Sequence, residues 1–266
     1  MIGVDYGTDS CRGILVDAAT GSIEAVSVAC YPRWKQGLYC DPSRDCYRQH
    51  PLDYVETFMA VMRDLREHVG GDAFKQVRAI SFDTTGSTPV LTDRTGTPLA
   101  LIPEFAEEPD AMFILWKDHT AKCEADAINE LAHRSQPDYT RYSGGTYSAE
   151  WVWSKVLHVL RTNSRVRAEA YAWIEHSDWM SALLTGRQRP EEVLRNRCAA
   201  GHKAMWHESW GGLPSESFFA ALGPELKGWR GRFRNQTDTA DVPVGPITPE
   251  YAAQLGLSED TLIGAG

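Results

Sequence analysis

A short polar segment near the N-terminus carries side chains suited to binding a phosphate group and its metal ion. Asp5, Gly7, Thr8, Ser10 and Arg12 lie close together between two apolar runs. Glycine lets the backbone approach an anion, the hydroxyls donate hydrogen bonds, and arginine is a fixed cation. A carboxylate is a hard oxygen ligand of the kind that Mg²⁺ takes. The segment predicts a site for a phosphate tail with magnesium at Asp5, and an ordinary hairpin is the alternative.

The flanking residues predict the strands that would position this segment. Apolar runs cover Ile2–Asp5, Gly13–Val16 and Ile23–Tyr31, and polar turns separate them at Gly7–Ser10 and Asp17–Gly21. Short apolar runs divided by Gly, Asp, Ser and Thr are typical of antiparallel strands. We therefore expect a three-stranded meander, with the polar segment in its first turn.

The next residues predict a surface loop, a helix and a further strand. Residues 36–50 are polar and indicate a loop. Pro51 suits a helix start, apolar residues follow at near-helical spacing, and Gly70 ends the pattern. Val77–Phe82 indicates a buried strand, and the polar run Asp83–Thr88 forms a second turn after it.

The pattern changes at about residue 104, where helical stretches and tryptophan become frequent. We expect helices over Thr120–Ala132, Tyr147–Thr162 and Arg165–Leu184, and a further one over Thr248–Leu255. This division predicts a core formed by residues 1–103 and 236–266. Residues 104–235 would be a helical elaboration that forms one wall of a substrate cleft.

Composition excludes several classes of function. The 266 residues are 42% hydrophobic and 24% charged, which is ordinary for a globular protein. The net charge of −9 argues against a general nucleic-acid binder. No apolar run is long enough for a membrane span, and the N-terminus lacks the zones of a signal peptide. We therefore expect a cytoplasmic protein whose six cysteines are free thiols, with a Cys40–Cys46 pair as the alternative.

Five residues outside the first turn are candidates for binding a substrate. Trp116 and Asp118 follow an apolar run. The flat face of a tryptophan can pack against the C–H groups of a sugar, and a carboxylate can accept hydrogen bonds from its hydroxyls. The alternative is a tryptophan in the core beside an ion pair on the surface. Gly86 could admit a ligand to the backbone or serve only its turn. Lys203 occupies a polar gap before an apolar run, and Tyr147 lies near a helix that could simply be buried.

The first turn resembles the phosphate loop of the actin/hexokinase/Hsp70 ATPase superfamily, and in particular of the FGGY carbohydrate kinases. The family pattern is an apolar strand, Asp-x-Gly-Thr-x-Ser-x-Arg and a second strand, and this chain fills every slot. The resemblance implies an α/β, ribonuclease-H-like domain with a mixed sheet and a helical elaboration. It also implies ATP and Mg²⁺ as cofactors.

Six further blocks strengthen the resemblance, which is greatest to the L-ribulokinases within the family. These blocks begin at Asp83, Pro103, Leu115, Ser143, Ser177 and Asn196. The resemblance implies that residues 1–266 are the N-terminal domain of a two-domain kinase. The C-terminal domain and the general base would lie beyond this chain, so the chain alone is expected to be inactive.

The resemblance also implies a substrate and roles for the candidate residues. The whole protein would phosphorylate a terminal hydroxyl of a ketopentose, with L-ribulose as the first choice. Gly86, Trp116, Asp118 and Lys203 would contact the sugar, and Tyr147 is a weaker candidate. A kinase for another polyol, such as xylulose or glycerol, and a non-catalytic sugar-binding module are the alternatives. A homodimer is a further option, since such kinases use either domain for dimer contacts.

Overall fold

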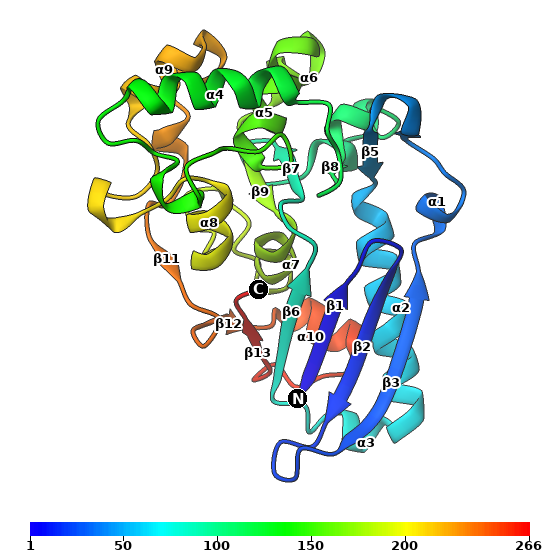
Figure 1. Ribbon diagram of the computed structural model, residues 1–266. Coiled ribbons are helices and arrows are strands. Elements are labelled where there is room, and N and C mark those ends of the chain that lie inside the picture. The colour runs from blue at the N-terminus through cyan, green and yellow to red at the C-terminus, as the bar shows by residue number, and fades with distance from the viewer.

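A six-stranded mixed sheet forms one half of the molecule in the computed structural model, which describes residues 1–266 (Figure 1). The strand order is β12-β13-β6-β1-β2-β3. The bounds of these strands in chain order are β1 Ile2–Tyr6, β2 Ser10–Val16, β3 Ile23–Cys30, β6 Ala79–Thr84, β12 Pro243–Pro246 and β13 Leu262–Gly264.

The pairing of the strands confirms the predicted meander and places three strand ends at one edge. Strands β1, β2 and β3 pair antiparallel. Strands β1 and β13 both pair parallel with β6. The carboxyl ends of β1, β6 and β13 therefore point to the same edge of the sheet, which is the edge that faces the helical half of the molecule (Figure 1).

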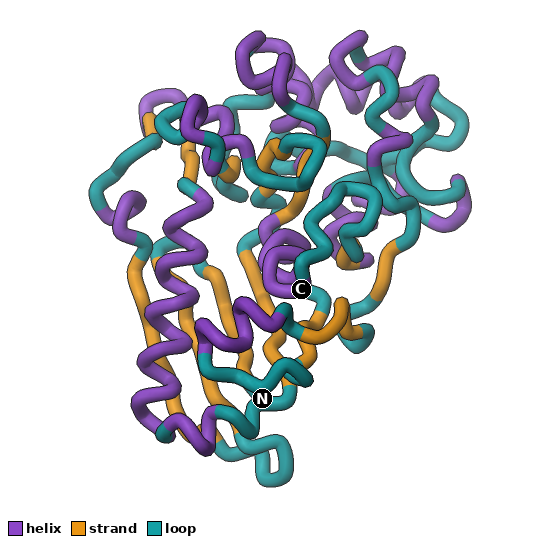
Figure 2. Tube along the Cα trace, turned by 180° about the vertical axis from the view of Figure 1, so that it is seen from behind, coloured by secondary structure: helices purple, strands orange, loops and turns teal.

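One long helix covers a face of this sheet. Helix α2 (Pro51–Val69) lies along β2 and β3, and α10 (Pro249–Leu255) lies beside it (Figure 2). The His50 side chain accepts a hydrogen bond from the Leu52 amide and caps the start of α2, with Pro51 at the first helical position. The apolar side of α2 joins the strands in a core of 29 buried residues. The predicted helices at both places are confirmed.

A second core of 30 buried residues lies among the helices of the other half. The predicted helices after Thr120 and Tyr147 are confirmed, although the second begins five residues later, at Val152. The main helices there are α4 Lys122–Arg134, α5 Val152–Thr162, α6 Ser164–Glu169, α8 Arg197–Lys203 and α9 Glu216–Leu222.

The prediction of one helix over Arg165–Leu184 is wrong. After α6, the chain forms β9 (Ala172–Glu175) and then α7 (His176–Thr185). Strand β9 pairs antiparallel with β7 (Pro89–Thr92), and all four of its residues are buried. The cross-strand partner therefore overrides a local pattern that suits a helix. Helix α7 contacts β6, β12 and β13, so it packs on the main sheet.

The prediction of a surface loop over residues 36–50 is also wrong, because its last residues are buried and parts of it form strands. The segment contains β4 (Cys40–Asp41) and β5 (Cys46–Gln49), and β5 pairs with β8 (Phe113–Ile114). The remaining short α-helices and strands are α1 Pro32–Lys35, α3 Gly71–Phe74, β10 Arg195–Asn196 and β11 Thr237–Asp238. None of the helices is both long and apolar enough to cross a bilayer.

Candidate functional site

Two polar turns and the last residues of the chain meet at the edge where the parallel strands end. The first loop, residues 7–9, follows β1, and the elbow, residues 85–88, follows β6. Gly266 lies just after β13. In open α/β sheets, ligands bind outside the carboxyl ends of the strands. The topology therefore selects this edge as the candidate site.

Neutral side chains hold the backbone of the first loop. The Tyr31 hydroxyl donates to the Gly7 carbonyl at 3.0 Å, and the Gln49 amide donates to the Thr8 carbonyl at 2.7 Å. The Trp116 indole N–H donates to Thr8 Oγ1 at 3.1 Å. The loop closes on itself through the Gly7 amide and the Ser10 carbonyl, 3.0 Å apart. Asp9 in the loop accepts from the Trp34 indole N–H at 2.6 Å, whereas the charged Asp5 and Arg12 beside the loop take no part in these contacts.

The charged residues predicted to bind phosphate and magnesium do lie together. Asp5 Oδ2 and Arg12 Nη2 are 2.8 Å apart, and each side chain is about half exposed, at 46% and 52%. Asp83 lies directly opposite Asp5 across the parallel pair of β1 and β6. A Cβ at Gly7 would meet Arg12 Nη2 at 2.5 Å, so glycine there leaves room for the guanidinium.

The acidic residues at this edge fit a magnesium ion that also binds phosphate. Mg²⁺ is usually held by one or two carboxylates together with phosphate oxygens and water. Asp5 and Asp83 supply two such carboxylates. The chain shows no group of three or more His, Cys, Asp or Glu side chains that could hold a metal by themselves. Two carboxylates would leave the other ligand positions of the ion to phosphate oxygens and water.

A polar cavity of about 330 Å³ opens beside the elbow and contains two of the predicted sugar-binding residues. Gly86 and Lys203 both line it, and we refer to it as the polar cavity. Its other lining residues are Asp83, Thr84, Glu175, Ser177, Asn196, Cys198, Ala199 and Gly266. The cavity thus joins the sequence-distant elbow and α8, as the sequence-based hypothesis for these two residues requires.

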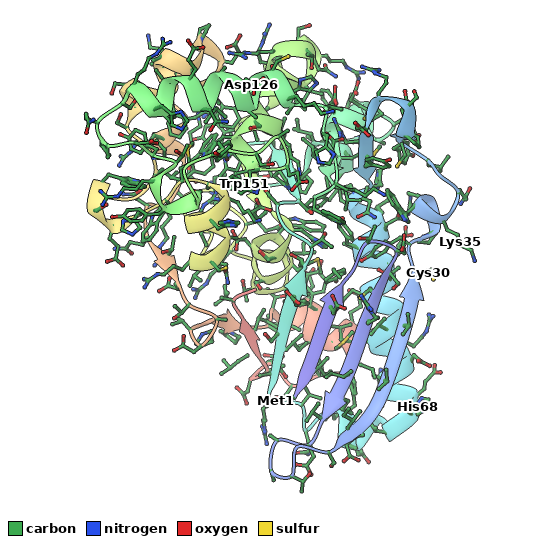
Figure 3. The ribbon with its side chains drawn as sticks, viewed as in Figure 1. Met1, Cys30, Lys35, His68, Asp126 and Trp151 are labelled. Atoms are coloured by element: carbon green, nitrogen blue, oxygen red, sulfur yellow. The ribbon has the colours of Figure 1, made fainter.

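The surroundings of Gly86 and Lys203 suit contact with a polar ligand. A Cβ built on Gly86 would have no atom within 4 Å, so the fold leaves open space in front of that backbone. The half-buried Lys203 is the last residue of α8, and its Nζ lies 5.4 Å from the centre of the Trp151 ring. Trp151 lies in the helical half, well away from Met1 at the far end of the sheet (Figure 3).

The structure places Trp116 and Asp118 outside the lining of the polar cavity. Trp116 is 38% exposed and contacts the first loop through Thr8. Asp118 is fully buried and pairs with Arg48 while accepting from the Tyr47 amide at 2.8 Å. Burial opposes ionisation of Asp118, but the Arg48 guanidinium holds its pKa below the ordinary value. The Asp118 side chain therefore holds β5 and the turn at Thr120 from the interior.

Tyr147 is also buried, and it supports the helix that carries Lys203. Its hydroxyl donates to the Lys203 carbonyl and accepts from the Trp153 amide at 3.1 Å. This arrangement holds the C-terminal end of α8 against α5. Tyr147 thus supports the polar cavity indirectly, because it holds the backbone of Lys203 in place.

Sequence reasoning missed a group of buried ionisable residues at the polar cavity: Glu175, which lines it, and Lys155, Asp178 and Arg195, which do not. Glu175 Oε2 accepts from the Thr88 amide at 2.8 Å, and its other oxygen accepts from the Ser87 hydroxyl. Burial lowers the pKa of Lys155, while the nearby Glu175 carboxylate favours its charged form, and burial raises the pKa of Asp178 to about 7. A lysine inside the apolar start of α5 was the available signal, because lysine is almost never buried without partners.

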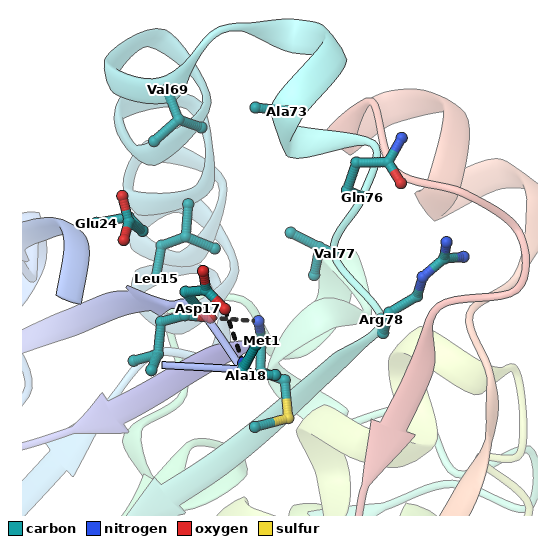
Figure 4. Close-up of a pocket in the computed structure, with 12 residues that line it drawn as sticks. Met1, Leu15, Asp17, Ala18, Glu24, Val69, Ala73, Gln76, Val77 and Arg78 are labelled. Atoms are coloured by element: carbon teal, nitrogen blue, oxygen red, sulfur yellow. Dashed lines mark hydrogen bonds between the residues drawn. The ribbon is translucent and has the colours of Figure 1, made fainter. Parts of the chain in front are cut away.

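A separate apolar cavity of about 440 Å³ lies at the opposite end of the sheet (Figure 4). Its lining includes Met1, Leu15, Val69, Val77 and Arg78. The Met1 amino group donates to the Val16 carbonyl at 2.8 Å, which places this cavity at the start of β1. None of the predicted site residues lines it, so it takes no part in the candidate site.

A protein-family model and individual relatives both show similarity to carbohydrate kinases over the whole of this chain. The model of the N-terminal domain of the FGGY family of carbohydrate kinases matches residues 1–266. A ribulokinase from Vibrio parahaemolyticus is 46% identical over 267 residues, which cover 100% of this chain and 47% of the relative. A ribulokinase from Shouchella clausii is 34% identical over 273 residues, with the same coverage of both chains. The chain therefore spans about half the length of these relatives.

Solved structures of sugar kinases share the fold. A xylulose kinase from Brucella ovis aligns with a TM-score of 0.76 at 17% identity and covers 100% of this chain and 48% of its own. A gluconate kinase from Lactobacillus acidophilus aligns with a TM-score of 0.73 at 20% identity and covers 100% of this chain and 47% of its own. These likenesses confirm the predicted α/β fold with its mixed sheet.

Proposed function

Because the chain belongs to the FGGY family of carbohydrate kinases, we propose that it is the sugar-binding half of an ATP-dependent kinase for a ketopentose. The whole protein would transfer the γ-phosphoryl group of ATP to a terminal hydroxyl of the sugar. One observation carries this proposal: the polar cavity with Gly86 and Lys203 opens at the same sheet edge as the first loop. The ribulokinase relatives make L-ribulose the first candidate substrate.

The first loop and its neighbours would bind the nucleotide phosphates. Thr8 and Ser10 would donate hydrogen bonds, the backbone at Gly7 would admit the anion, and Arg12 would supply positive charge. Asp5, with Asp83 beside it, would hold Mg²⁺, which neutralises phosphate charge when bound. Phosphoryl transfer depends mainly on positioning and charge stabilisation, and these are the properties that this loop offers.

The polar cavity would bind the sugar. Lys203 would donate hydrogen bonds to a hydroxyl, and the open backbone at Gly86 would contact the substrate closely. Trp116 borders the first loop, so we place it between the phosphate and sugar groups. Asp118 and Tyr147 would support these residues from the interior.

The complete site would need residues outside this chain as well. We propose that residues 1–103 and 236–266 form the core and that residues 104–235 form the cleft elaboration. The remaining part of the protein would supply the opposite wall of the cleft and the general base. Closure of the two parts would exclude water, which competes with the sugar as acceptor. Residues 1–266 alone should therefore be inactive; a homodimer and a cytoplasmic location remain predictions.

A panel of acceptors tests this function. The whole protein is incubated with ATP, Mg²⁺ and L-ribulose, xylulose, glycerol or gluconate, and ADP and the phosphorylated product are measured. We expect the highest kcat/KM with L-ribulose. Preference for glycerol or xylulose would support the alternative of another polyol kinase. Sugar binding without any product would instead support a non-catalytic binding module.

A further inference from the structure

Lys155 places a buried ammonium against the backbone of two loops. The residue is 1% exposed on α5. Its Nζ donates to the carbonyls of Ser87 at 2.7 Å, Leu115 at 2.9 Å and Ile114 at 3.4 Å. A lysine ammonium has three N–H donors and no acceptor, so these three carbonyls use its full capacity. The side chain is therefore committed to holding backbone and is not available to a ligand.

The three carbonyls belong to segments on the two sides of the candidate site. Ser87 directly follows Gly86, which lines the polar cavity. Leu115 directly precedes Trp116, whose indole N–H donates to Thr8 in the first loop at 3.1 Å. A single ammonium thus connects the sugar side of the site with the phosphate side.

A second buried ionisable side chain, Glu175, also holds the elbow. Glu175 accepts from the Ser87 hydroxyl and from the Thr88 amide. Ser87 is therefore bound by Lys155 at its carbonyl and by Glu175 at its hydroxyl. Hydrogen bonds to charged groups are stronger than those between neutral groups, so the elbow has little freedom to shift.

We propose that Lys155 is a positioning residue for phosphoryl transfer, because it fixes the elbow against the Leu115–Trp116 segment. This inference rests on the proposed kinase function. The aligned sugar and phosphate groups must stay close to an in-line geometry, and a misplacement of about 1 Å can reduce the rate about 100-fold. Lys155 would maintain that alignment without touching either substrate.

Lys155→Met in the whole protein tests the proposal, with Val159→Ala as the matched control. Methionine keeps most of the volume and removes the three donors. Val159 is fully buried on the same helix and belongs to the helical core. Below the unfolding temperature of both variants, we expect Lys155→Met to lower kcat about 10- to 100-fold and to raise the sugar KM. Val159→Ala should keep both constants close to those of the parent.

Hydrogen exchange gives a readout that does not depend on activity. The Thr88 amide donates to Glu175, and the Leu115 amide donates to the Tyr47 carbonyl at 3.1 Å. In Lys155→Met both amides should exchange faster, and in Val159→Ala neither should. Should Lys155→Met not fold, the parent protein still decides: the two amides should open with the same equilibrium constant and the same response to denaturant.

Parent-like kcat and exchange in Lys155→Met would overturn the proposal, as would independent opening of the two amides in the parent. A different result identifies failure of the proposed function. If the two amides open together but the whole protein phosphorylates none of the acceptors, the coupling of the loops stands and the kinase assignment falls.

Discussion

The first loop and the elbow follow neighbouring parallel strands, but the protein uses charge differently in the two places. Around the first loop, Asp5 and Arg12 are about half exposed, and neutral groups such as Tyr31 and Gln49 hold the backbone. Around the elbow, the charges of Lys155 and Glu175 are buried and hold the backbone themselves.

This difference separates charge that serves a ligand from charge that serves the fold. An exposed ion pair contributes at most about 1 kcal/mol to stability, so changing Asp5 should leave the protein folded. Removing one partner from a buried, hydrogen-bonded group leaves unsatisfied polar atoms and is much more damaging. Substitutions at the first loop should therefore change turnover alone, whereas those behind the elbow should change turnover and stability together.

The largest effect is expected at Asp5. Asp5→Ala in the whole protein should reduce kcat on the order of 10²- to 10³-fold, because a group that stabilises charge during the reaction is lost. The sugar KM and the unfolding temperature should change little. Steady-state kinetics and calorimetry measure these quantities, with Glu67→Ala on the exposed side of α2 as the control. Activity within a few-fold of the parent would mean that the first loop is a plain hairpin.

The buried charges behind the elbow should make stability depend on pH. Burial raises the pKa of Asp178 from 3.8 to about 7, so the folded state binds its proton more tightly than the unfolded state. The contribution of Asp178 to the free energy of unfolding should therefore fall as pH rises from about 4 to 7, by at most about 1.4 kcal/mol per pH unit. The buried His176, whose pKa burial lowers, contributes with the opposite sign.

Urea unfolding of residues 1–266 at several pH values, followed by tryptophan fluorescence, tests this dependence. Asp178→Asn should remove this downward contribution between pH 4 and 7, because the amide does not ionise. The control is Asp72→Asn on the exposed side of α3, which should keep the slope of the parent. If the free energy of unfolding of Asp178→Asn depended on pH as it does in the parent, the buried ionisable groups near the elbow would not have the effect on stability that we assign to them.

Lys203 should affect the sugar and not the nucleotide. Lys203→Met should raise the sugar KM about tenfold or more, because a hydrogen bond from a charged group is worth roughly 1.5–3 kcal/mol. The KM for ATP should stay close to that of the parent, since Arg12 and the first loop bind the phosphates. Initial-rate kinetics with the exposed Lys75→Met as control distinguish the two. Equal changes in the KM values for sugar and ATP would show that the polar cavity and the first loop do not bind the two substrates separately.

A substitution at Gly86 should weaken sugar binding slightly without changing the stability of the fold. A Cβ there meets no protein atom, so Gly86→Ala should unfold at the same temperature as the parent. The added methyl group points into space that a sugar would occupy, and we expect a five- to tenfold rise in the sugar KM, on the order of 1 kcal/mol. A lower unfolding temperature with an unchanged KM would show that the glycine serves only the turn.

Local sequence signals predicted the parts of the fold that depend on local physics. The meander and α2 follow from apolar periodicity, turn residues and Pro51. Strand β9 was missed because a short buried apolar run suits a helix or a strand equally, and only its pairing with β7 decides. Strands β4 and β5 were missed because the polar segment is held by a contact 70 residues away, between Arg48 and Asp118.

The site shows the same limit. The residue types around the first loop have a known spacing, so their juxtaposition could be predicted. Gly86 and Lys203 were placed in one pocket from a family resemblance, and the polar cavity brings them together. Lys155 and Glu175 are distant in sequence from the elbow and contact its backbone carbonyl and amide groups. No pattern of residue types in the sequence therefore predicts their role.

Chemical-shift mapping of L-ribulose on isotope-labelled residues 1–266 tests the central claim most directly. The account predicts millimolar binding, because about half of the pocket is missing, with shifts at the Gly86 amide and along Cys198–Lys203. The apolar cavity around Met1 and Val77 should show none (Figure 4). Shifts confined to that distant cavity, or micromolar affinity from a pocket complete within this chain, would contradict the assignment of the polar cavity as half of a kinase sugar site.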